Sequence, residues 1–142
     1  MEFDVVIVGG GPAGLSTSIK LMQISKDQSL DLNICVLEKG SEIGAHILSG
    51  AVIDTRALDS LLPDWESENA FIQTPVKKDE MYLLRGQDSS ISIPTFFMPR
   101  TLINHGNRII SLGSLCKYLG EKAEAMGAVS YTHLTLPTTP YV

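Results

Sequence analysis

A glycine-rich turn directly after an apolar run constrains this chain more than any other feature. Phe3 to Val8 is rich in β-branched residues, which is typical of a strand buried on both faces of a parallel sheet. Gly9, Gly11 and Gly14 follow with the spacing of a dinucleotide fingerprint. In that fingerprint the first glycine allows a sharp turn, the second lets the backbone approach a diphosphate, and the third lets a helix pack on the strand. The turn therefore predicts a nucleotide site.

The elements after the turn complete a strand, helix, strand unit. Leu15, Ile19 and Met22 share one helical face, and Leu32 to Leu37 reads as a second buried strand. Glu38 ends that strand, where a carboxylate can accept both hydroxyl protons of an adenosine ribose. A carboxylate there also repels a 2′-phosphate, which disfavours NADP. FAD and NAD share the same ADP half, so this motif does not separate them.

The remaining pattern adds smaller elements to this unit. We expect a short helix that carries apolar residues from Ala57 to Trp65, with Pro63 as its stop. An antiparallel hairpin is expected within Thr74 to Pro99, and a strand at Arg108 to Ile110. An amphipathic helix capped by Ser111 ends near Gly127, and no further strand is expected after it. The predicted fold is therefore α/β: a Rossmann-like βαβ part of an FAD-binding domain, with an inserted antiparallel hairpin and an incomplete sheet.

Composition excludes several classes of protein. The 142 residues carry 11 Lys and Arg against 16 Asp and Glu, a net charge of −5 that argues against a nucleic-acid partner. No apolar stretch reaches the roughly 18–20 residues of a membrane-spanning helix. Cys35 and Cys116 stand alone, so we expect buried thiols rather than a metal site in this chain. The N-terminus enters a strand at once, which leaves no room for an export leader.

Longer motifs identify a family. The segment from Glu38 to Asp54 reads EKGSEIGAHILSGAVID, and it follows VVIVGGGPAGLS. Further along stand LLPDW, TPV, NHGN and IISLGSLCKYLGEKAEAMGA. From Met1 to about Ala128 the chain resembles the N-terminal part of electron transfer flavoprotein–ubiquinone oxidoreductase. IGAHILSGAV and NHGN are more specific to that family than the glycines are.

The resemblance implies an electron-transferring-flavoprotein dehydrogenase for a full-length parent. Such an enzyme holds FAD and one [4Fe-4S] cluster, and it passes electrons from reduced electron transfer flavoprotein to ubiquinone. It lies on a membrane surface, here expected to be the cytoplasmic face of a bacterial-type inner membrane. The implied FAD-binding residues are Gly9, Gly11, Pro12, Ala13 and Gly14 at the diphosphate, Glu38 at the ribose, and Ser49 and Gly50 near the flavin, with Lys39 as a further cofactor-binding residue.

Other functions stay open at this level. A related membrane-associated FAD-dependent reductase or monooxygenase shares the same N-terminal plan, and a truncated product that only binds nucleotide is a rival from another class. His46 and His105 lie in glycine-containing loops without a fixed carboxylate or nucleophile, so no catalytic residue is assigned. The stripe of Leu58, Leu61, Leu62 and Trp65 fits a core face better than a membrane contact.

The last residues do not resemble the family. No cysteine follows Cys116, so the cluster ligands are not in this chain. Residues 1–128 are expected to form a partial FAD-binding domain, and residues 129–142 a tail foreign to it. Val129 to Thr138 reads VSYTHLTLPT, which one reading frame of a widely used sequencing-library transposon adapter encodes. We therefore expect the tail to be a sequencing-adapter artefact.

Overall fold

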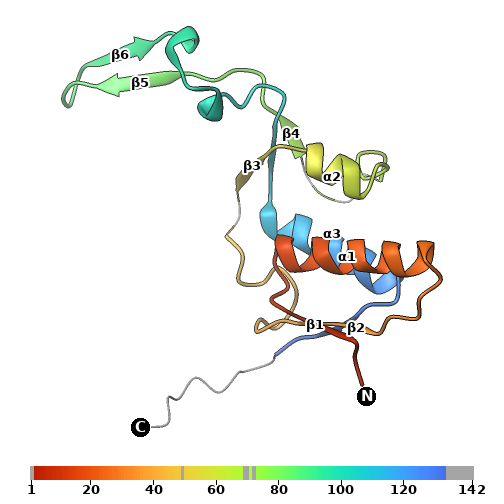
Figure 1. The fold of residues 1–142 in the computed structure, drawn as a ribbon. Helices are drawn as coiled ribbons and strands as arrows, with labels where there is room; N and C mark the ends of the chain where they lie inside the picture. The colour runs from red at the N-terminus through yellow and green to blue at the C-terminus, as the bar shows by residue number, and fades with distance from the viewer. Residues whose placement is uncertain (1, 49, 69–70, 72, 134–142) are drawn as a thin grey trace.

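The computed structural model describes residues 2–48, 50–68, 71 and 73–133. They form a helix-covered body and an arm that projects from it (Figure 1). The body holds a parallel sheet under two helices, and a small antiparallel sheet joins it to the arm. Among the described residues, no helix is both long and apolar enough to cross a membrane.

The parallel sheet has three strands in the order β1-β2-β8. Strands β1 (Val5–Val8) and β2 (Ile34–Leu37) pair in the expected unit, with helix α1 (Pro12–Asp27) between them in the chain. Helix α3 (Leu112–Ala125) leads into β8 (Val129–Tyr131), which pairs with β2. The prediction that no strand follows Gly127 is therefore wrong. An edge strand needs backbone partners more than apolar side chains, and the polar residue Ser130 takes its place opposite Val36.

Among the described residues, helices cover only one face of this sheet. Helices α1 and α3 pack together on the face that bears Ile34 and Val36, and both side chains are almost fully buried. Val6 and Val8 point to the opposite face, where they are 52% and 68% exposed. The expectation that β1 is buried on both faces is therefore wrong. The continuous apolar run of β1 is typical of a strand with two covered faces, but in the described part of the chain helices cover only the face that bears Ile34 and Val36.

The second sheet and α2 lie above the helices. Strand β7 (Arg108–Ile110) pairs antiparallel with β3 (Ala51–Ile53) and β4 (Gln73–Pro75), and α2 runs from Arg56 to Leu61. Trp65 is 1% exposed, stacks on Phe71 with ring centroids 5.5 Å apart, and donates from Nε1 to Asp59 Oδ1 at 2.7 Å. Leu58 is also buried, which confirms the core interpretation of this stripe. The helix ends at Leu61 with Leu62 as its C-cap, directly before the expected stop at Pro63, so Trp65 lies beyond the helix.

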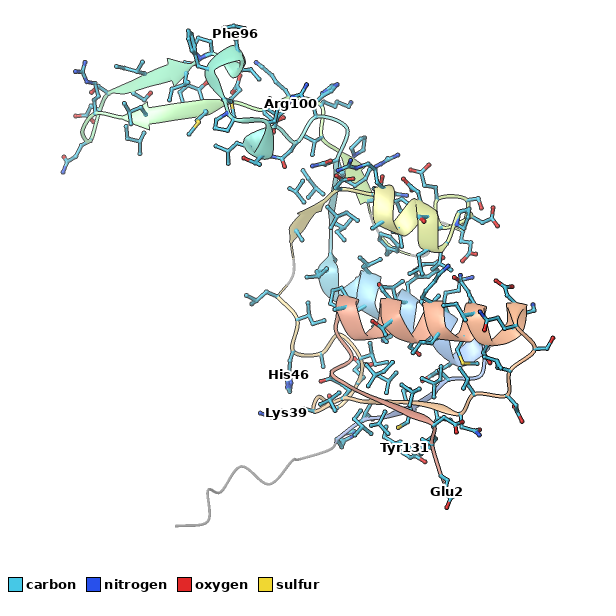
Figure 2. All side chains as sticks on the ribbon, in the orientation of Figure 1. Glu2, Lys39, His46, Phe96, Arg100 and Tyr131 are labelled. Atoms are coloured by element: carbon cyan, nitrogen blue, oxygen red, sulfur yellow. The ribbon has the colours of Figure 1, made fainter. Side chains whose placement is uncertain are left out.

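The arm is the predicted hairpin. Strands β5 (Met81–Leu84) and β6 (Ser90–Ile93) pair antiparallel, and two 3₁₀ helices follow at Thr95–Phe97 and Arg100–Leu102. The arm stands away from the helices, with Phe96 90% exposed at its far side (Figure 2). At its base the Asn104 amide donates to Asp79 Oδ2 at 3.0 Å, which ties the hairpin to the NHGN turn.

Candidate functional site

The carboxyl ends of β1 and β2 bring the predicted site residues together. The glycine turn follows β1 and Glu38 follows β2, and the Gly9 amide donates to Leu37 O at 2.8 Å. In open α/β sheets, ligands bind outside the carboxyl ends of the strands. The sequence motif and the topology therefore point to the same edge of the sheet.

Each glycine of the motif has its own geometry. Gly9 has φ +107°, a left-handed conformation that side chains other than glycine rarely adopt. A Cβ on Gly14 would stand 2.1 Å from Gly9 O, so α1 can approach the turn only with glycine there. A Cβ on Gly11 would meet nothing within 4 Å. The backbone of Gly11 is therefore open on the side where a diphosphate would approach, which fits the nucleotide assignment.

The start of α1 offers backbone amides to an anion. Gly11 is the N-cap, Pro12 lies at the start of the helix, and the first turn holds no acidic residue. The Leu15 amide donates to Gly11 O at 3.0 Å, and the amides of Ala13 and Gly14 come before it. The first amides of a helix have no partner within the helix, and the helix dipole favours negative charge at this end. A diphosphate satisfies both conditions.

Glu38 joins the two loops at this edge. Its Oε2 accepts from the Gly10 amide at 2.8 Å, and its Oε1 accepts from the Gly40 amide at 2.7 Å. The buried Cys116 of α3 has its pKa raised to about 11, mainly by burial and further by the charge of Glu38. An ionised carboxylate has about four acceptor positions, so two remain for ribose hydroxyls. Glu38 therefore fixes the backbone of both loops and keeps acceptor positions for further donors.

The other predicted residues are less tightly gathered. Lys39 is exposed and lies on the same side of the molecule as His46 in Figure 2. The His46 ring is close to Gly40, because a Cβ on Gly40 would stand 3.5 Å from His46 Nδ1. Gly50 has φ +87° and directly precedes β3. It therefore lies at the start of a strand of the antiparallel sheet. Ser49 lies outside the described residues. The residues predicted for the ADP half of FAD, the glycine turn and Glu38, thus lie together at the carboxyl ends of β1 and β2. These contacts do not bring Gly50, predicted for the flavin, to the same place.

Sequence reasoning missed the contact between α3 and the loop after Glu38. Gly113 and Gly120 lie within α3, and both approach this loop closely. Apolar periodicity does not mark such residues, because a glycine contributes no side chain to a helical face. The available signal is the presence of two glycines in a helix, each less favourable there than alanine by roughly 0.5–1 kcal/mol.

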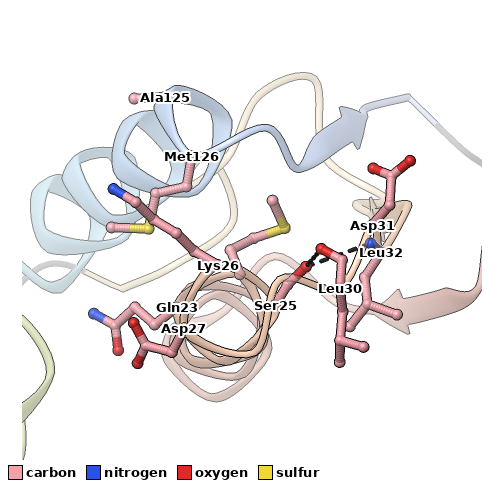
Figure 3. A pocket seen from close by; sticks show the side chains of 10 residues that line it. Gln23, Ser25, Lys26, Asp27, Leu30, Asp31, Leu32, Ala125 and Met126 are labelled. Carbon is pink, nitrogen blue, oxygen red and sulfur yellow. Dashed lines mark hydrogen bonds between the residues drawn. The ribbon is translucent and has the colours of Figure 1, made fainter.

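The cavity in Figure 3 lies at the opposite edge of the sheet. Its volume is about 690 Å³, and the last turns of α1 and α3 contribute Lys26 and Met126 to its wall. There Ser25 Oγ donates to Leu30 O at 2.7 Å, which holds the turn after α1. This is the amino end of the strands, so the position does not favour a nucleotide. Among the described residues, no three His, Cys, Asp or Glu side chains gather as metal ligands.

Comparison with known proteins agrees with this geometry. Residues 7–64 match the family model of the NAD(P)-binding Rossmann-like domain. Over 131 residues the chain is 52% identical to the electron transfer flavoprotein-ubiquinone oxidoreductase of Pseudomonas aeruginosa. Over 130 residues it is 53% identical to the mitochondrial protein of that name from Dictyostelium discoideum. The expected family resemblance is confirmed. The matches cover 92% of this chain but only 24% and 21% of these oxidoreductases, so it corresponds to a short N-terminal piece of them.

Solved structures support the fold alone. A geranylgeranyl bacteriochlorophyll reductase-like protein from Thermoplasma acidophilum aligns with a TM-score of 0.62 at 21% identity, over 92% of this chain and 30% of that one. The tetrameric form of 2-methyl-3-hydroxypyridine-5-carboxylic acid oxygenase aligns with a TM-score of 0.61 at 22% identity, over 91% of this chain and 31% of that one. The mixed α/β class with a Rossmann-like unit is thereby confirmed.

Proposed function

We propose that this chain supplies the ADP-binding part of the FAD site of an electron transfer flavoprotein–ubiquinone oxidoreductase. The observation that carries the proposal is the Glu38 carboxylate, which is held by the Gly10 and Gly40 amides beside the open backbone of Gly11. Glu38 would accept the ribose hydroxyl protons, and the first amides of α1 would bind the diphosphate. FAD, when bound, supplies the electron-carrying chemistry.

Titration calorimetry of the chain with ADP tests this proposal. Glu38→Ala should weaken ADP binding by about 1–3 kcal/mol, because the ribose hydroxyls lose a charged acceptor. Glu38→Gln should also lower the free energy of unfolding by about 1–3 kcal/mol, because the glutamine nitrogen replaces one of the two accepting oxygens and cannot accept from a backbone amide. The exposed helix residue Glu121, changed to Ala, is the control. Equal ADP affinity in wild type and Glu38→Ala would contradict the proposed binding mode.

The electron route is part of the same proposal. Electrons would pass from reduced electron transfer flavoprotein through FAD and a [4Fe-4S] cluster to ubiquinone, with the cluster bound by polypeptide that this chain does not include. Identity of about 50% to proteins named for this reaction supports it. The oxygenase structures are only about 20% identical, so they give the alternative of a monooxygenase no comparable support.

We also propose contact with a membrane surface, on the cytoplasmic face of a bacterial-type inner membrane. Leu48 is 88% exposed in the loop after Glu38, and Val52 is exposed nearby in β3. Leu58 and Trp65 do not take part, because both are buried. Flotation of the full-length parent with anionic liposomes tests the contact. Loss of flotation in Leu48→Ser supports it, and wild-type protein that stays with the soluble fraction contradicts it.

For the tail, we propose that residues 129–142 are foreign to the parent gene. The support is the match of Val129 to Thr138 to an adapter translation. Amplifying the locus across the codon for Gly127 should show a reading frame that departs from this tail and later encodes four clustered cysteines. The native residues should still form a strand, because the edge of β2 is available for pairing. Genomic DNA that encodes this tail followed by a stop codon would contradict the proposal.

A further inference from the structure

Helix α3 has a glycine on the same face at two places. Gly113 and Gly120 are seven residues apart, which is close to two full turns, so both lie on one side of the helix. Lys117 stands between them and pairs with Glu42 at 3.2 Å across this side. Alanine would favour the helix more than glycine does at either position. A preference for glycine here calls for a reason outside the helix.

That reason is the loop after β2. A Cβ on Gly113 would stand 3.2 Å from Gly44 O, and a Cβ on Gly44 would stand 2.6 Å from Gly113 O. A Cβ on Gly120 would stand 2.8 Å from Ile43 Cδ1. Residues 42–44 of the loop thus rest on α3 at three consecutive points. The Lys117 pair is largely exposed and adds little stability, so close packing on the two glycines defines the position of the loop.

The loop position reaches Glu38 through Gly40. The Gly40 amide donates to Glu38 Oε1 at 2.7 Å, and the residue is packed tightly between Glu38 and Glu42. A Cβ on Gly40 would be 3.1 Å from Glu42 O and 3.2 Å from Glu38 Oε1. Gly40 therefore lies close to both Glu42 and the Glu38 carboxylate, and it links the loop to that carboxylate.

We propose that Gly113 and Gly120 are positioning residues for the nucleotide site. They seat residues 42–44 against α3, so that the Gly40 amide holds the Glu38 carboxylate toward the ribose hydroxyls. The inference rests on the proposed function and assigns part of its specificity to the packing of α3 against the loop after Glu38. Its signature is the loss of ribose recognition without loss of phosphate binding.

Two ligands and one exchange measurement test it on the 142-residue chain. Wild type should bind ADP more tightly than 2′,3′-dideoxy-ADP, because only ADP offers hydroxyl protons to Glu38. Gly113→Ala and Gly120→Ala should each lower ADP affinity roughly three- to tenfold and leave dideoxy-ADP affinity unchanged, in line with a weakened charged hydrogen bond. Hydrogen exchange at the amides of residues 40–44 should be faster in both variants, while exchange in β1 stays the same.

Two further variants separate positioning from general damage. Ile43→Ala combined with Gly120→Ala should restore ADP affinity, because it removes the methyl group that meets the new Cβ. Glu121→Ala should behave as wild type. An equal loss of both ligands, or unchanged exchange at residues 40–44, would overturn the inference. If wild type fails to bind ADP while the variants exchange faster, the proposed function fails and the seating of the loop on α3 stands.

Discussion

At the scale of single residues, the motif glycines differ in what a side chain would meet. Gly14 faces the carbonyl oxygen of Gly9, whereas Gly11 faces open space. The spacing of the motif was enough to assign these roles, because turn, approach and packing follow from the positions of the glycines relative to strand and helix. It did not reveal the double hydrogen bonding of Glu38 to Gly10 and Gly40, which depends on how two loops lie in space.

This contrast gives a prediction for two matched variants. Gly14→Ala should lower the free energy of unfolding by about 3 kcal/mol or more, because its Cβ would overlap a backbone oxygen that cannot rotate away. Gly11→Ala should change stability by less than about 1 kcal/mol and should weaken ADP binding at least roughly tenfold, since its Cβ fills the approach of the diphosphate. Urea unfolding and calorimetry measure the two effects. A stable Gly14→Ala variant would show that the strand and helix can separate.

At the scale of elements, the strongest periodic segments were predictable, whereas of the three-residue strands β7 was predicted and β4 and β8 were not. The pattern around Leu115 and Leu119 predicted α3 with its Ser111 cap, whose hydroxyl accepts from the Ser114 amide. Strands β4 and β8 have three residues each, so period-two alternation has almost nothing to act on. Their place is set by the partners β7 and β2, which offer unpaired backbone groups.

Helix α3 also carries the two groups whose protonation should control stability at high pH. Burial raises the pKa of Cys116 to about 11 and that of Tyr118 to about 12, the latter further raised by Glu68, which accepts from its hydroxyl at 3.0 Å. A raised folded-state pKa means that the neutral form is favoured by folding. The stabilisation from Cys116 is therefore complete below its ordinary pKa of 9.0 and is lost as the pH rises to its folded-state pKa of about 11. The stabilisation from Tyr118 is complete below its ordinary pKa of 10.0 and is lost as the pH rises to about 12.

We expect the urea midpoint of the chain to fall steeply above pH 9, by an amount equivalent to about 1–3 kcal/mol for Cys116 alone. Cys116→Ala should remove the part of this fall between pH 9 and 11, and Tyr118→Phe the part above pH 10. Both variants will be less stable than wild type at neutral pH, so the slope against pH is the quantity to compare. A slope identical to wild type in both would rule out these groups as the cause.

At the scale of the whole molecule, the parallel sheet has one covered face and one open face. The open face is formed by residues in register across the sheet, namely Val6 with Val129 and Val8 with Tyr131. All four are exposed by more than a third. Local patterns could not show this, because the pattern of β1 describes a strand with two covered faces and the cover for the second is not among these residues.

The open face predicts how the isolated chain behaves. It should bind a dye for apolar surface and associate with itself, because exposed contiguous apolar patches favour association. Val6→Thr together with Val8→Thr should reduce both effects and change stability by less than about 1 kcal/mol, since threonine keeps the β-branched shape. Ile19→Ala on the covered face is the contrast and should cost about 2–5 kcal/mol. A monomeric wild type that binds no dye would contradict this account.

The open face also has a consequence for the order of events during synthesis. A protein of the relatives' length that begins with this piece has about three quarters of its chain still to be made when α3 and β8 emerge. At roughly 5–20 residues per second, a ribosome needs on the order of tens of seconds to add several hundred residues. Throughout that interval Val6 and Val8 face the solvent on a nascent chain. We therefore expect a chaperone that recognises exposed apolar side chains to bind this face on the nascent chain.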